Sequence, residues 1–238
     1  MISPIVHDTS PVLLVGGGKH RKSALTQLCG LLGAPGKGAC AQLVAADSGA
    51  DFLLRRGLVP DWVIGDLDSI SAAALTKLSA ARIHKVNEQE STDFEKCLSR
   101  IAAPLVLGAG FLGGRLDHTL AAFHTLAALA ERRCILIGAR DIVFLAPPEI
   151  TLALAPGTRV SLFPLGPVQA TARGLRWPVE ALDFDPLQQI GTSNSALGPV
   201  TLSCAAARLL VILPRSALGP ALAGFSGCAA GWPPQTAL

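Results

Sequence analysis

Apolar and polar positions divide the first part of the chain into short apolar runs that alternate with helix-like segments. The runs have the length of buried strands, and several end in glycine or aspartate. They read "PVLLVGGG" (11–18), "AQLVAAD" (41–47), "DWVIG" (61–65), "PLVLGAG" (104–110) and "RCILIG" (133–138). Strands that alternate with helices form parallel sheets wrapped by those helices. We therefore predict, over residues 1–147, an α/β domain with a Rossmann-like parallel sheet and helices on both faces.

Helix-like segments follow most of these runs. Residues 22–33 and 49–57 each end in a glycine, as helices commonly do. Thr92 with Glu95 three residues later forms a capping box, which predicts a helix start at this point. A further helix is expected from residue 116 on, with one apolar face. That face would consist of Leu116, Leu120, Phe123 and Ala127.

The pattern changes after residue 147. Residues 148–214 contain short strand-like runs broken by "APG", "PLGP" and "RG", without a recognisable amphipathic helix. They predict a small antiparallel β domain. Residues 215–238 are rich in glycine, alanine and proline and lack periodicity, so we expect a loosely held tail.

Composition narrows the classes of partner. The net charge is only +3 and no block of lysine or arginine stands out, which argues against nucleic acid. The mean hydropathy is +0.46, but the longest apolar runs are strand-length, far below the roughly 20 residues of a membrane helix. The first residues also lack the basic and apolar regions of a signal peptide. We therefore expect neither a nucleic-acid nor a membrane partner.

Six cysteines are spread along the chain without a C-x-x-C pair. They are Cys29, Cys40, Cys97, Cys134, Cys204 and Cys228. This distribution is typical of reduced thiols, several of them in a core, rather than of a zinc site or a disulfide framework. We therefore expect a cytoplasmic protein without zinc.

Acidic residues follow successive predicted strands. Asp47 ends one run, Asp66 and Asp68 follow the next, and Asp93 stands at a helix start. Ligands of parallel sheets bind beyond the carboxyl ends of the strands, and carboxylates that converge there repel one another unless a cation neutralises them. Hard carboxylate oxygens suit Mg²⁺, which usually shares its shell with substrate phosphates. We expect these four acids to hold Mg²⁺; for each acid alone, the alternative is a helix cap or a turn residue.

The segment "GAGFLGGRLDHT" (108–119) contains G-x-G-x-x-G, the spacing of a dinucleotide-binding fingerprint. That fingerprint belongs to the first strand–helix unit and is followed by a strand ending in an acid, whereas here the next run ends in Gly138. The glycines lead instead into Arg115 and Asp117 at a helix start, which favours phosphate over NAD. A dinucleotide-binding oxidoreductase is the alternative. We interpret Gly16–Gly18 as a strand-to-helix turn, with an approach to a nucleotide as its alternative.

Several motifs together resemble the thiamine pyrophosphokinase family. In chain order they are "AADSGADFLLRRGLVPDWVIGDLDSI", "EQESTDFEKCL", "GAGFLGGRLDHTL", "VSLFPLGPV", "GLRWPV" and "GTSN", within residues 11–213. The resemblance implies an N-terminal α/β domain, a C-terminal β-sandwich and a homodimer with active sites between subunits. It also implies Mg²⁺-dependent transfer of a pyrophosphoryl group from ATP to the hydroxyethyl oxygen of thiamine, giving thiamine diphosphate and AMP.

The resemblance further implies roles for individual residues. The metal ligands would be Asp47, Asp66, Asp68 and Asp93. ATP would contact Asp47, Gln89, Asp93, Gly113, Gly114, Arg115 and Asp117, and thiamine would contact Trp177, Ser193 and Asn194. The catalytic set would be Asp66, Asp68, Asp93, Arg115 and Asp117, with the general base open between Asp93 and Asp117. Where Ser48 stands, the family often has glycine.

Two other functions fit the same residues. The first is another Mg²⁺- and ATP-dependent kinase or pyrophosphokinase that acts on a different small heterocyclic alcohol; AMP as product would indicate pyrophosphoryl transfer and ADP an ordinary kinase. The second is a non-catalytic sensor of nucleotide or thiamine, which would bind its ligand without turnover.

Overall fold

The computed structural model describes residues 2–18, 30, 42–228 and 231–234. The chain divides into two compact units, one of Met1–Thr125 with Leu136–Ala139 and one of Leu126–Ile135 with Arg140–Leu238. Two of the three points of division lie within helix α5 (Leu116–Ala128) and strand β8 (Cys134–Ile137), and the third lies between Ala139 and Arg140. The helix expected over residues 22–33 lies almost entirely outside the described residues, as do Cys29 and Cys40.

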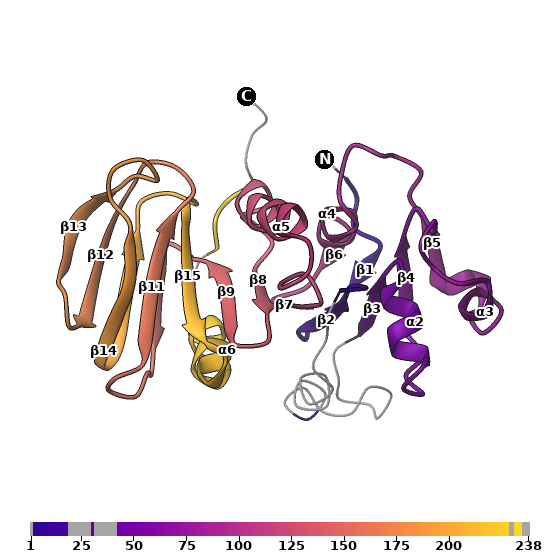
Figure 1. Cartoon of the computed structure of the whole chain (residues 1–238), viewed down its shortest axis with the longest axis horizontal. Coiled ribbons are helices and arrows are strands. Elements are labelled where there is room, and N and C mark those ends of the chain that lie inside the picture. The colour runs from indigo at the N-terminus through magenta and orange to yellow at the C-terminus, as the bar shows by residue number, and fades with distance from the viewer. Residues whose placement is uncertain (1, 19–29, 31–41, 229–230, 235–238) are drawn as a thin grey trace. The chain divides into compact units, whose positions relative to one another are not determined.

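The first unit contains a parallel sheet in the order β7-β2-β3-β4-β5, with its strands labelled in Figure 1. The strands are β2 (Val12–Val15), β3 (Leu43–Ala46), β4 (Trp62–Gly65), β5 (Ile83–Lys85) and β7 (Val106–Ala109). A short parallel pair joins β1 (Val6–His7) to β6 (Ile101–Ala102). Every residue of β2, β3 and β7 is buried, as in parallel sheets covered on both faces. The predicted α/β class is confirmed.

Short helices connect these strands. They are α2 (Gly49–Leu54), α3 (Ala72–Leu75), the 3₁₀ turn η1 (Ala80–Arg82) and α4 (Asp93–Leu98). Both α2 and α4 pack against β3, and α4 also packs against β4. The predicted capping position is confirmed, because Thr92 Oγ1 accepts a hydrogen bond of 3.3 Å from the backbone amide of Glu95. The cap begins α4 at Asp93 and so fixes where this acid stands.

Helix α5 does not bury the face that we predicted. Leu116 and Leu120 are 73% and 58% exposed, and the other two residues of that face are only partly buried. The buried positions are instead Ala122, Thr125 and Leu126. Both faces have helical spacing, and the Thr125 hydroxyl donates to the Ala121 carbonyl within the helix, so a polar residue is accommodated on the inner face. The prediction from helical spacing alone therefore identified the wrong face of α5 as the buried one.

The second unit is antiparallel. Its strands are β9 (Asp141–Leu145), β10 (Glu149–Leu152), β11 (Arg159–Pro164), β12 (Val168–Leu175), β13 (Val179–Phe184), β14 (Gly191–Cys204) and β15 (Leu209–Pro214). The long strand β14 pairs with β11 through its first part, up to Ser195. From Ala196 on it pairs with β12, and part of this second stretch also pairs with β10. One strand thus contributes to two sheets, which gives the β-rich second domain that we expected.

The second unit begins before the boundary that we expected at residue 147. Strand β9 pairs along its whole length with β15, from Asp141 opposite Pro214 to Leu145 opposite Leu210. These ladder hydrogen bonds join β9 to the second unit. The apolar run that forms β9 does not indicate in the sequence which strand it pairs with. We therefore placed the boundary between the two domains a few residues too late.

Residues 215–227 are ordered secondary structure rather than the loosely held tail that we expected. They form the 3₁₀ turn η2 (Arg215–Ala217) and helix α6 (Leu218–Gly227). The buried ring of Phe225 lies 5.2 Å from that of Phe144. A Cβ on Gly224 would lie 2.8 Å from the Thr151 carbonyl oxygen, so the glycine allows α6 to approach β10 closely. The glycine and alanine content of this segment led us to expect a tail without structure. In the structure, these small residues allow the helix to pack closely against the strand.

Across the described residues, the helices lack the combined length and apolarity that crossing a membrane requires.

Candidate active site

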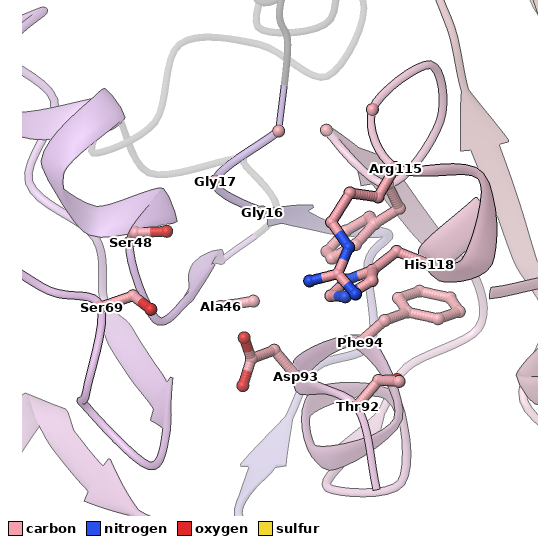
Figure 2. A pocket seen from close by; sticks show the side chains of 14 residues that line it. Gly16, Gly17, Ala46, Ser48, Ser69, Thr92, Asp93, Phe94, Arg115 and His118 are labelled. Carbon is pink, nitrogen blue, oxygen red and sulfur yellow. The ribbon is translucent and has the colours of Figure 1, made fainter. Parts of the chain in front are cut away.

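A cavity of about 310 Å³ opens at the carboxyl ends of β2, β3 and β7 (Figure 2). Its walls come from the first residues after these strands and from the beginnings of α4 and α5. It is lined by Gly16, Gly17, Gly18, Ala46, Ser48, Ser69, Thr92, Asp93, Phe94, Gly110, Phe111, Gly114, Arg115 and His118. This is the edge of the sheet at which the sequence predicted a ligand site.

Glycines bring the backbone close on one side of the cavity. A Cβ on Gly16 would lie 2.6 Å from the Phe111 ring, and one on Gly18 would lie 2.2 Å from the Gly110 carbonyl oxygen. Gly110 and Gly113 have φ angles of 88° and 79°, in the left-handed region that favours glycine. The G-x-G-x-x-G segment is therefore a tight turn at the cavity. Gly16–Gly18 lies on the cavity wall, as our alternative interpretation of these glycines required.

Two phenylalanines and a histidine complete the walls without having been predicted. The rings of Phe94 and Phe111 are 4.7 Å apart and tilted by 45°. Figure 2 shows Phe94 and His118 on the same side of the cavity as Arg115. The sequence signal for them was only their position in the first turn of a helix or just after a strand.

Three of the four predicted metal ligands lie together. Asp47, Asp66 and Asp68 can each offer a carboxylate oxygen such that all three atoms lie within 4.8 Å of one another. We call these residues the acid group. Asp47 and Leu67 have φ angles of 43° and 68°, an uncommon conformation for residues with a side chain. Such backbone strain concentrates at functional sites, and here both residues belong to or adjoin the acid group.

The environment of Asp47 fits a bound cation. Its Oδ2 accepts a hydrogen bond of 3.1 Å from the Ser69 amide, whereas its buried Oδ1 has no hydrogen-bond partner among the described residues. Burial, and then the charge of Asp93, raise the pKa of Asp47 to about 6. Gly65 allows this packing, since a Cβ there would lie 3.0 Å from the Asp47 Cβ. An unsatisfied buried oxygen beside two further carboxylates is a donor set suited to a hard divalent ion such as Mg²⁺.

We expect Asp47 to make the metal-free protein less stable as pH rises from about 4 to about 6. Its folded pKa of about 6 lies above the ordinary value of 3.8, so in this window the folded state retains a proton that the unfolded state has lost. The contribution amounts to at most about 3 kcal/mol. Denaturant unfolding gives the free energy of unfolding of the wild type and of Asp47→Asn, whose side chain stays neutral at every pH. The contribution of Asp47 is the pH-dependent part of the difference between these two free energies. A difference that does not change with pH would contradict this assignment.

Lys96 is a further site residue that the sequence analysis missed. Its Nζ lies 2.7 Å from Asp66 Oδ2 and 3.9 Å from Asp93 Oδ1, and its side chain is 2% exposed. The hydrogen bond from Lys96 lowers the pKa of Asp66, so this carboxylate stays ionised. The available signal was the position of Lys96 three residues after Asp93, one helical turn along α4.

Asp93 lies on the cavity wall but outside the acid group. Burial, and then the charge of Asp66, raise the pKa of Asp93. Gln89, the other polar residue of this segment, has its Nε2 3.4 Å from Asp66 Oδ2. Both side chains therefore lie close enough to the acid group to contact a ligand held there.

Arg115 and Asp117 form a two-point ion pair at the start of α5, with Arg115 directly before the helix and Asp117 in its first turn. The distances are 3.1 Å from Arg115 Nε to Asp117 Oδ1 and 2.5 Å from Nη2 to Oδ2. Both side chains are exposed, and Arg115 lies on the cavity wall together with Gly114. Hydrogen bonding from Arg115 lowers the pKa of Asp117 to about 2. Arg115 thus provides a positive charge for an anionic ligand, and Asp117 provides a carboxylate that is ionised at neutral pH.

In the second unit, the three predicted thiamine contacts lie close together in the structure. The Asn194 Oδ1 accepts a hydrogen bond of 3.1 Å from the Trp177 amide, and Asn194 Nδ2 donates one of 2.8 Å to the Trp177 carbonyl. Asn194 is buried, whereas Trp177 is 54% exposed. Ser193, which directly precedes Asn194 in the chain, has a φ of 64°. The amide of Asn194 is thus occupied in holding the Trp177 backbone, and the half-exposed indole ring has the Arg176 guanidinium carbon 5.3 Å from its centroid.

Family models match both units. A model described as "Thiamin pyrophosphokinase, catalytic domain" matches residues 38–137, and one described as "Thiamin pyrophosphokinase, vitamin B1 binding domain" matches residues 149–209. Together the two matches span most of the chain. The first contains the acid group and the second contains Trp177.

Individual relatives agree with the family models. Thiamine pyrophosphokinase 2 of Oryza sativa subsp. japonica is 31% identical over an alignment of 159 positions, which covers 59% of this chain and 60% of the relative. The chain thus spans about 60% of the length of the curated relatives it matches. Among solved structures, thiamin pyrophosphokinase from Candida albicans has a TM-score of 0.71 at 18% identity, covering 88% of this chain and 93% of its own. The enzyme from Geobacillus thermodenitrificans has a TM-score of 0.70 at 24% identity, covering 86% and 97%. Because both sequence identities are below 25%, these structural matches support the fold alone.

Proposed function

Because this chain belongs to the thiamin pyrophosphokinase family, we propose that it transfers a pyrophosphoryl group from ATP to the hydroxyethyl oxygen of thiamine, giving thiamine diphosphate and AMP. The observation that carries the proposal is the acid group beside the cavity, with a buried Asp47 oxygen that lacks a hydrogen-bond partner among the described residues. A nucleotide triphosphate with its divalent cation is the ligand whose chemistry matches this donor set.

Mg²⁺ would be held by Asp47, Asp66 and Asp68, with Asp93 nearby. Bound there, it would offset the negative charge of the phosphate oxygens during transfer. Lys96 holds Asp66 in place by its hydrogen bond and adds one positive charge behind the carboxylates. Phosphoryl-type transfer depends mainly on positioning and electrostatics, and these residues supply both.

The ATP phosphates would lie against Gly113, Gly114 and Arg115, with Asp117 orienting the guanidinium. Of the two candidates for the general base, Asp93 is the better proton acceptor. Burial raises the pKa of Asp93, whereas hydrogen bonding from Arg115 lowers the pKa of Asp117 to about 2. Asp117 is therefore assigned to orienting Arg115, and Asp93 to accepting the hydroxyl proton if the reaction needs a base.

Thiamine would bind to the second unit through the exposed indole of Trp177 and the neighbouring Ser193. Asn194 contributes by fixing the backbone of Trp177. An aromatic face suits the planar heterocycles of thiamine, as it suits nucleic-acid bases.

Trp177→Ala should raise the KM for thiamine about tenfold or more while leaving the KM for ATP nearly unchanged. The reason is the loss of ring stacking, which contributes about 1–3 kcal/mol in comparable complexes. Steady-state kinetics with each substrate varied in turn measure the split, and Trp177→Phe should recover most of the loss. An equal rise in both KM values would contradict a specific contact between Trp177 and thiamine.

The same proposal includes a homodimer and a cytoplasmic location. Leu116 and Leu120, one turn apart on α5, are large exposed apolar residues that a second copy could cover. Cys97 and Cys204 are buried free thiols, as in a reducing compartment.

The deciding experiment is incubation of the purified protein with ATP, Mg²⁺ and thiamine, followed by chromatographic separation of the products. Thiamine diphosphate and AMP in equal amounts are expected. ADP in place of AMP would indicate an ordinary kinase, and turnover only with another heterocyclic alcohol would indicate a different acceptor. Binding of ATP or thiamine without turnover would indicate a sensor.

A further inference from the structure

Ser48 carries a hydroxyl that the local fold does not use. It stands at the N-cap position of α2, where serine usually accepts a backbone hydrogen bond, but its side chain makes no cap here. It lines the cavity instead, and Figure 2 shows its hydroxyl on the wall across from Arg115. The neighbouring Ser69 hydroxyl, by contrast, is engaged, donating to Asp68 Oδ1 at 2.9 Å.

The absence of a side chain at Gly17 leaves room for the Ser48 hydroxyl. A Cβ built on Gly17 would lie 2.0 Å from Ser48 Oγ and 3.2 Å from Ser48 Cβ. The first distance is impossible for a real contact, so any side chain at residue 17 would force the hydroxyl to turn away. With glycine at residue 17, the hydroxyl keeps its place at the cavity. The position of the Ser48 hydroxyl therefore depends on glycine at residue 17.

The position of Ser48 indicates the kind of ligand group that it meets. Ser48 directly follows Asp47, which belongs to the acid group, and Arg115 lines the same cavity. A divalent ion on such carboxylates usually shares its shell with phosphate oxygens. The ligand atoms nearest to Ser48 are then anionic oxygens, for which a hydroxyl is a donor.

We propose that Ser48 is a positioning residue that donates its hydroxyl hydrogen bond to the phosphate chain of the nucleotide, and that Gly17 is required to keep this hydroxyl in place. The inference rests on the proposed function for the identity of the nucleotide. It goes beyond that function by assigning a contact to the residue at which this chain departs from the family's usual glycine. Hydrogen bonds to charged groups are stronger than those between neutral groups, which sets the expected size of the effect.

The first test is the affinity for ATP in the presence of Mg²⁺, measured by calorimetry on the full chain. Ser48→Ala and Ser48→Gly should each weaken ATP binding about tenfold, with adenosine binding unchanged. Ser226→Ala, the same change on the exposed side of α6, serves as the control and should bind ATP like the wild type. Unchanged ATP affinity in both Ser48 variants, or an equal loss for adenosine, would overturn the proposal.

The second test is a double-mutant cycle between residues 17 and 48. Gly17→Ala alone should weaken ATP binding at least as much as Ser48→Ala, because its methyl group displaces the hydroxyl. Added to Ser48→Gly, the same change should cost less than twofold further, since the remaining backbone contact at 3.6 Å is ordinary. Additive losses would contradict the pairing of the two residues.

The two hypotheses fail in different ways. Wild-type protein that binds ATP but forms no thiamine diphosphate would refute the proposed function, and the variant affinities would still decide the role of Ser48. Wild-type protein that turns over normally, with ATP affinity equal in the wild type and Ser48→Ala, would refute only the Ser48 contact. Wild-type protein that fails to bind ATP would refute both.

Discussion

Asp66→Ala and Asp68→Ala should each lower the turnover number for thiamine diphosphate formation by about two to three orders of magnitude. Both carboxylates belong to the acid group that would hold Mg²⁺ against the ATP phosphates. Removing one preorganised stabiliser of transition-state charge typically has an effect of this size. The measurement is AMP release at saturating ATP and thiamine over a range of Mg²⁺ concentrations, which separates weakened metal binding from lost turnover.

Asp68→Ala is the cleaner of the two variants. Asp68 is exposed, so its removal should leave the folded state intact, whereas Asp66 is also the partner of the buried Lys96. Asp183→Ala, which removes an exposed carboxylate of the second unit, is the matched control and should keep wild-type turnover. Near wild-type turnover of both acid-group variants at saturating Mg²⁺ would remove the pair from the site.

The acid group could be predicted because parallel sheets have a direction. Strands β3 and β4 are neighbours in the sheet, so the residues that follow them meet at one edge. Asp47 comes directly after β3 and Asp66 directly after β4, and Asp68 is two residues further along. Strand ends are readable from apolar runs, and this is sufficient to bring their neighbours together without any knowledge of side-chain packing.

Features that depend on which side of an element faces inward could not be predicted in the same way. A lysine in a helix is ordinarily solvated, so the position of Lys96 three residues after Asp93 was not sufficient to predict that α4 turns it toward the acid group. On α5, Leu116 and Leu120 were the most apolar residues at helical spacing, yet the smaller Ala122 side of the helix is buried. The close approach of α6 to β10 likewise depends on Gly224, whose lack of a side chain looks like a helix breaker in the sequence.

Lys96 changes the electrostatic interpretation of the site. The acid group and Asp93 would together carry several negative charges, and a buried ammonium group offsets part of this charge before any metal binds. Hydrogen bonding to Lys96 lowers the pKa of Asp66, while burial raises the pKa of Asp47 to about 6. The site therefore contains one carboxylate that stays ionised and another that readily takes up a proton, and a divalent ion would displace that proton.

Lys96→Met should lower the free energy of unfolding by about 3 kcal/mol, the usual result of removing one partner from a buried ion pair. Methionine keeps the apolar stem of the side chain but leaves the largely buried Asp66 carboxylate without its 2.7 Å partner. Denaturant unfolding in the absence of Mg²⁺ measures the loss. Lys77→Met, the same change at an exposed position, is the control and should lie within about 0.5 kcal/mol of the wild type.

A second substitution separates the loss of the ion pair from the loss of packing. Asp66→Asn removes the charge that Lys96→Met leaves uncompensated, so the double variant should be clearly more stable than the sum of the two single losses predicts. Saturating Mg²⁺ should also stabilise Lys96→Met by more than it stabilises the wild type, because the ion would replace the missing positive charge. Strictly additive losses, together with equal stabilisation by Mg²⁺, would mean that Lys96 contributes packing alone and that the acid group tolerates its own charge without it.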